Sequence, residues 1–314
     1  MFSTDYDKYR KKIEGVFQSE LDKSPDIDIK RILVILTNPK HHSEFAKVIA
    51  ELIKHDRAQI KLLNALHFYR SKAEKLGIKV KTLDDLVETI KNENVSTGEI
   101  EMVQEGDPFQ GICEIVQTSR VDLIIVQYPF AEFLEEEKFD EDSLGKTIES
   151  LVSFVMHDTP IPLLIIKKPE KMLEGSYKNV LMVISDWFNA RLFKTLIWIN
   201  RNLKPRVNIL PFYKKHVIIS EIPPEEELKE IQEKISKIYY DIKYWLEKYA
   251  FDLEIQSLEP SMDHFEILNY SNYSSPDLIS LYVPRKPEEI PLFQEIVRKI
   301  HSNILIVPEF DDTK

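Results

Sequence analysis

The chain has 314 residues, of which 43% are hydrophobic and 30% charged, and a formal net charge of −11 at pH 7. The negative charge disfavours a general nucleic-acid binder and a surface drawn to anionic lipid. Cys113 is the single cysteine, which excludes an intrachain disulfide and a cysteine-based metal cluster. No apolar run approaches the roughly 20 residues of a membrane-spanning helix, and the N-terminus lacks a signal-peptide core, so we expect a cytoplasmic protein.

Residues 1–29 are polar and charged, and they predict a helical extension or linker. From residue 30, short apolar runs alternate with segments of helical periodicity, which is typical of a parallel sheet with helices on both faces. The strands expected in this first domain, residues 30–169, are 32–36, 59–66, 99–104, 123–126 and 163–166. The helices expected between them are 45–53, 83–90, 109–117 and 144–156.

The same order of elements begins again after a linker near 170–176 and fills a second domain, residues 177–310. Its expected strands are 180–184, 207–212, 253–256, 278–283 and 304–307, and its expected helices are 188–202, 224–249 and 290–300. A repeat of about 145 residues indicates a duplicated domain and is too long for a solenoid. We therefore expect an α/β protein with two domains, each a five-stranded parallel sheet with helices on both faces. The final strands could pair within one chain, as an internal pseudo-dimer, or between two chains, as a homodimer.

Two motifs of the first domain resemble the universal stress protein family. Residues 105–108, Glu-Gly-Asp-Pro, precede a helix and then residues 121–126, Val-Asp-Leu-Ile-Ile-Val, in the order that this family shows. Residues 158–162, Asp-Thr-Pro-Ile-Pro, resemble the family's approach to its last strand. Asp122 and Pro162 stand where the family has an Asp and a Pro. The resemblance implies the Rossmann-like parallel sheet.

ATP-binding members of this family carry an Asp after the first strand, a G-x-x-G loop after the fourth strand and a Gly-Ser pair at the last helix. This chain has only seven glycines, and residues 127–137 contain none of them but four glutamates, which would repel a triphosphate. The degenerate positions are Thr37, Gln127, Glu149 and Ser150. The resemblance therefore implies a nucleotide-binding fold that does not bind ATP, and we expect no cofactor.

The best small-ligand candidate in the sequence is an anion or nucleotide site in the second domain. Arg285 and Lys286 precede its last helix, and Asp186 follows its first strand. A helix N-terminus with two cations favours an anion, although an ordinary charged turn is the simpler interpretation.

Other features of the sequence have simple structural interpretations. The pair His41-His42 and the acidic run 132–142 could bind a cation, but a solvated loop explains each of them. No catalytic constellation, metal-spaced motif or P-loop is present in the sequence, so we expect no enzyme and no metal.

The leading expectation is a non-catalytic cytoplasmic module that regulates or scaffolds through protein contacts, without nucleic acid. Tandem domains of this kind also resemble the cytoplasmic tails of bacterial and archaeal secondary transporters, including cation–proton antiporters and cation–chloride cotransporters. That resemblance implies a membrane-transporter domain in cis as the partner and a location at the inner face of the membrane. The alternative is a small-molecule sensor that binds a nucleotide or another anion at Asp186, Arg285 and Lys286.

Overall fold

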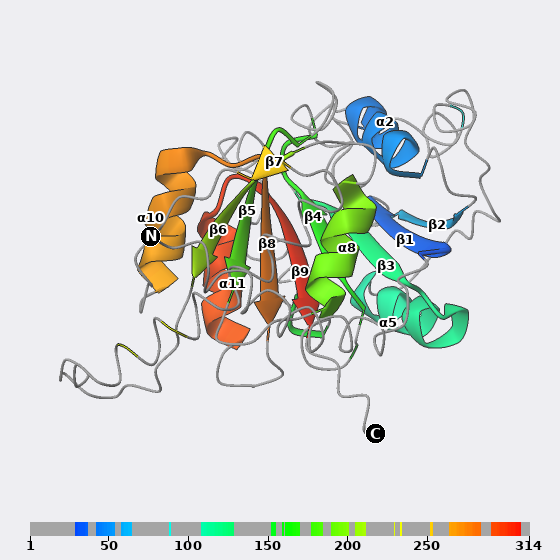
Figure 1. The fold of residues 1–314 in the computed structure, drawn as a ribbon. Helices are drawn as coiled ribbons and strands as arrows, with labels where there is room; N and C mark the ends of the chain where they lie inside the picture. The colour runs from blue at the N-terminus through cyan, green and yellow to red at the C-terminus, as the bar shows by residue number, and fades with distance from the viewer. Residues whose placement is uncertain are drawn as a thin grey trace, which may run out of the picture. The chain divides into compact units, whose positions relative to one another are not determined.

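The structure is a computed structural model (Figure 1). It describes residues 29–36, 42–53, 58–64, 88, 108–128, 152–154, 159, 161–169, 177–184, 190–200, 205–211, 229, 233, 252–253, 264–283 and 290–308. By compactness the chain divides into two units. The split unit contains Asp28–Ser176 and Val283–Lys314, and the central unit contains Tyr177–Tyr282.

The split unit has a mixed, mostly parallel sheet with the strand order β2-β1-β3-β4-β9. Its strands are β1 (Arg31–Leu36), β2 (Gln59–Asn64), β3 (Leu123–Gln127), β4 (Leu163–Ile166) and β9 (Asn303–Pro308). Its helices are α2 (His42–Ile53), α5 (Pro108–Ser119) and α11 (Ile290–Lys299). Every residue of β3, β4 and β9 is buried, as expected for apolar strands that are covered on both faces.

The first four strands of this sheet are parallel, and β9 runs antiparallel to β4. The register places Leu163 opposite Ile306, and Ile165 opposite Ile304. The sequence left open whether these two strands pair within one chain or between chains, and in the structure they pair within the chain. The sheet of the split unit is therefore mixed, because the final strand of the second expected domain joins it in the within-chain arrangement that the sequence offered.

The central unit has a parallel sheet with the order β8-β5-β6-β7. Its strands are β5 (Asn179–Ile184), β6 (Arg206–Pro211), β7 (Asp252–Leu253) and β8 (Leu278–Val283), and its helices are α8 (Ala190–Asn200) and α10 (His264–Ser274). The sequence did not predict α10. Among the side chains of α10 that the structure describes, residues 267–274, the buried apolar ones are Ile267 and Leu268, and Tyr273 is 91% exposed, so these residues form no continuous apolar stripe.

The structure confirms the α/β class and a mostly parallel arrangement of strands. The expected strand 99–104 lies outside the described residues, and so does most of the expected helices 83–90, 144–156 and 224–249. The compact units and the expected domains both have a boundary close to Tyr177. They differ after Tyr282, because α11 and β9 group with the split unit, whereas the repeat of elements assigned them to the domain 177–310.

Candidate functional site

Of the residues that the sequence singled out, Gln127, Asp122 and His42, the first residue of α2, lie in the described part of the chain. Gln127 is the last residue of β3, and its side chain is fully buried. Outside the described residues lie Thr37, Glu149, Ser150, Asp186, Arg285 and Lys286, together with His41 and the run 132–142. The candidate site that can be built from the structure is therefore the edge at which β3 and β4 end.

At this edge the chain leaving β3 stays beside the end of β4. Gln127 is in register with Ile166, and the backbone N–H of Tyr128 donates to the carbonyl of Ile166 at 2.8 Å. Carboxyl ends of parallel strands are the usual ligand-binding edge of an open α/β sheet. Here the first backbone amide after β3 is already used in a hydrogen bond within the protein.

Lys167 follows β4 directly and turns its ammonium group into the protein. The residue is 6% exposed, and its Nζ donates to the carbonyl oxygens of Val297, in α11, and of Ile300 at 2.6 Å. The same Nζ lies 4.2 Å from the centroid of the Tyr128 ring, a cation–π contact. Burial, and after it the charge of Lys168, lowers the pKa of Lys167 to about 7.

The side chain of Asn303, the first residue of β9, holds the same edge. It is completely buried, and its Oδ1 accepts from the backbone N–H groups of both Lys167 and Lys168 at 2.8 Å. Its Nδ2 donates to the carbonyl of Lys168 at 3.2 Å. We call Tyr128, Lys167 and Asn303 the Lys167 cluster; it joins the end of β4 to β9 and to the end of α11.

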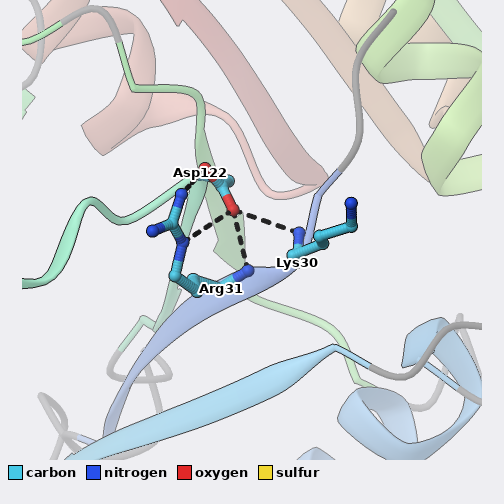
Figure 2. Close-up of polar contacts among 3 residues, drawn as sticks. All are labelled: Lys30, Arg31 and Asp122. Carbon is cyan, nitrogen blue, oxygen red and sulfur yellow. Dashed lines mark hydrogen bonds and ion pairs between the residues drawn. The ribbon is translucent and has the colours of Figure 1, made fainter.

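A second polar centre of the split unit lies at the opposite end of its strands, where β1 and β3 begin (Figure 2). Asp122 Oδ2 accepts from the backbone N–H groups of Lys30 at 3.1 Å and Arg31 at 2.8 Å. The guanidinium of Arg31 adds contacts of 3.4 Å to Oδ2 and 3.3 Å to Oδ1. This aspartate, which the family resemblance singled out, therefore anchors the start of β1.

The central unit has the same arrangement around Asp277, directly before β8. Its Oδ2 accepts from the backbone N–H groups of Lys178 at 2.9 Å and Asn179 at 3.0 Å, where β5 begins. The residue two positions before each aspartate has a positive φ, 48° at Arg120 and 42° at Ser275. In both units a helix ends, one left-handed residue turns the chain, and an aspartate then holds the neighbouring strand.

The sequence did not identify Lys167 and Asn303 as interacting residues. A lysine directly after four fully buried residues was a local signal for burial, but its partners on α11 and β9 are 130 to 136 residues away. Among the described residues, no three His, Cys, Asp or Glu side chains are grouped so that they could hold a metal ion. Across those residues, no helix is both long and apolar enough to cross a membrane.

No family model matches the sequence, and no curated protein matches it. Among solved structures, the chain is similar to a universal stress protein from Archaeoglobus fulgidus, with a TM-score of 0.57, 15% identity and coverage of 90% of this chain and 97% of that one. A structure from Pseudomonas aeruginosa UCBPP-PA14 that carries the same family name gives a TM-score of 0.57 at 16% identity, covering 89% and 93%. A functionally unknown protein from Pseudomonas aeruginosa PAO1 gives a TM-score of 0.57 at 16% identity, covering 89% and 92%. Together with its strand order, these similarities show that the chain has the Rossmann-like fold of the universal stress proteins.

Proposed function

We propose that the chain is a non-catalytic regulatory or scaffolding module that acts through protein contacts and does not bind ATP. The strongest support comes from the edge of the sheet where β3 and β4 end, because groups of the protein itself fill the place at which a ligand would bind. Gln127 is buried there, the N–H of Tyr128 is bonded to Ile166, and the ring of Tyr128 lies against the Lys167 ammonium. A phosphate-binding loop needs backbone N–H groups that are free to point at the ligand.

Membership of the universal stress protein family, with two domains in tandem, is part of this proposal. The shared fold and the motifs around Asp122 support the family. The matching anchors at Asp122 and Asp277 support the duplication, because each aspartate accepts from two consecutive N–H groups at the start of a strand. Each also donates its own backbone N–H to that strand, to Arg31 and to Asn179, both at 2.8 Å.

The more specific form of the proposal is a cytoplasmic regulatory domain of a membrane cation transporter. It rests on the resemblance of tandem domains with these motifs to the tails of secondary transporters. The gene that encodes the chain provides a direct test, because this form expects hydrophobic spans encoded upstream in the same reading frame. A native reading frame without such spans would leave the general proposal standing and remove the transporter.

Calorimetric titration of the purified full chain with ATP, AMP and cyclic nucleotides tests the general proposal. We expect no heat of binding and no nucleotide in the purified protein by mass spectrometry. Stoichiometric binding would overturn the proposal. If that binding is lost in Arg285→Ala and Lys286→Ala variants, the chain is the anion sensor that the sequence offered as the alternative.

A further inference from the structure

Lys167 is a buried cation at a junction between segments that are distant in the sequence. Its Nζ donates to the carbonyls of Val297 and Ile300, which lie at the end of α11, where a helix leaves carbonyls without donors of its own. The partial negative charge of a helix C-terminus offsets only part of the cost of burying a cation there. Lys167 therefore joins the end of β4 to the end of α11 by hydrogen bonds, and the buried apolar residues of α11 add to the burial of this helix.

No carboxylate pairs with Lys167 among the described residues. Among the described residues, the charged and titratable side chains on the elements packed around it, and directly beside their ends, are Asp122, Tyr128, Lys168, Glu295, Arg298, Lys299 and His301. Asp122 lies at the opposite end of β3 and is paired with Arg31. Glu295 is paired with Lys299 of its own helix at 2.5 Å, and Arg298 is exposed. Neither β3, β4 nor β9 contains a charged residue. The ammonium is compensated by two backbone carbonyls and one aromatic ring, and its nearest charged neighbour in the sequence has the same sign.

This environment changes how tightly the lysine holds its proton. Two carbonyls and a ring replace only part of the hydration that an ammonium has in water. Burial, with a smaller contribution from Lys168, accordingly lowers the pKa of Lys167 from 10.5 to about 7. If α11 and β9 separate from β4, water reaches Lys167 and the pKa returns toward that of an exposed lysine.

We propose that Lys167 couples the attachment of α11 and β9 on β4 to proton concentration on the alkaline side of neutrality, so that proton uptake loosens the attachment. The open form takes up a proton that the closed form lacks, and acid therefore favours the open form. Below about pH 7 both forms are protonated and the attachment is weakest; it strengthens up to pH 10.5 and then becomes constant. Between these limits the equilibrium constant that favours the closed over the open form rises about tenfold per pH unit.

The first test is the titration of the lysine side chains in the full wild-type chain. Lysine-selective ¹³C labelling and NMR follow each ε-carbon from acid to alkaline pH, and Lys167→Met assigns the relevant signal. We expect one ε-carbon to titrate close to pH 7. If every lysine titrates above about pH 9.5, close to the ordinary lysine value, the proposal is wrong. This outcome is decided in the wild-type chain and holds even if the variant does not fold.

The second test measures the attachment itself by amide hydrogen exchange in β4 and β9. After correction for intrinsic exchange, protection of the β4–β9 amides in the wild type should rise about fiftyfold between pH 7 and pH 9. In Lys167→Met the same amides should show no such rise. Lys168→Met is the matched control, because the described hydrogen bonds of Lys168 are made by its backbone. It should keep most of the rise, since burial of Lys167 is the larger cause of the shift. Protection that is independent of pH in the wild type, or a rise that is lost only in Lys168→Met, would overturn the proposal.

Discussion

Asp122 and Asp277 anchor the start of a neighbouring strand with the same hydrogen bonds, but in different surroundings. Asp277 is 8% exposed, and it lies close enough to the buried Tyr177 that its charge, after burial, raises the pKa of that hydroxyl. Asp122 has a side chain that is 25% exposed, and it makes an ion pair with Arg31. The bonds to the two backbone amides are common to both units, whereas the surroundings of the carboxylate differ. We infer that the amide contacts, and not the ion pair, are what the fold needs at this position.

The largest effect is expected for Asp277→Ala. Removing a buried charged acceptor leaves the N–H groups of Lys178 and Asn179 without that partner, which should lower the free energy of unfolding by about 3 kcal/mol. Urea unfolding followed by tryptophan fluorescence measures it, because all three tryptophans lie between residues 177 and 282. Asp277→Asn keeps an acceptor oxygen and should lose less. Wild-type stability in the alanine variant would show that the anchor contributes nothing.

Asp122→Ala should have a smaller effect, about 1.5 kcal/mol, because water can replace part of the lost acceptor at this more exposed position. Far-UV circular dichroism during urea unfolding of the full chain reports on the split unit as well as the central unit. The urea midpoint of the tryptophan signal should shift less than it does in Asp277→Ala. A larger loss for Asp122→Ala than for Asp277→Ala would contradict the ranking by burial.

Arg31→Met removes the contact that only the Asp122 anchor has. The guanidinium is 42% exposed, so the ion pair should contribute only about 0.5 kcal/mol, and 1 M salt should abolish that difference. Parallel urea titrations at low and high salt measure it. If Arg31→Met were as damaging as Asp122→Ala, the ion pair would be the main function of the aspartate and our inference would fail.

The smallest effects are expected at the two left-handed residues. In Arg120→Gly and Ser275→Gly the backbone keeps its positive φ without the steric strain of a side chain. Glycine also makes the unfolded chain more flexible, which offsets part of this gain, so each variant should raise the free energy of unfolding by about 0.5 kcal/mol or less. Ser275→Gly should gain less, because the serine hydroxyl also donates to the carbonyl of Asn272 at 3.4 Å. Thermal unfolding of both variants beside the wild type shows the difference. A loss of stability at both positions would mean that the left-handed turns are not strained.

Much of the fold could be predicted from the sequence, because parallel strands buried on both faces leave continuous apolar runs. Residues 123–126 and 163–166 are such runs, and they become β3 and β4. α10 escaped prediction for the opposite reason. Among its described side chains, residues 267–274, two apolar ones are buried and the other buried position is Ser271, so the pattern of these residues does not differ from that of a polar loop.

The candidate site was less predictable. Gln127 was found because the family's phosphate-binding loop follows the strand at this point, but its burial and its neighbours follow from the tertiary structure. The partners of Lys167 are carbonyl groups, which every residue has, so no residue type at a fixed spacing could indicate them. Asn303 stands before an apolar run, where an asparagine usually indicates a turn, and only the antiparallel pairing with β4 brings it to Lys167 and Lys168.

The antiparallel pair of β4 and β9 has a consequence for how the protein responds to dilution. Both strands belong to one polypeptide, so each meets its partner at an effective concentration that is set by the intervening chain. A pair made from two separate subunits would dissociate as the protein concentration falls. The covalent connection makes this edge pairing independent of how many copies of the protein a cell contains.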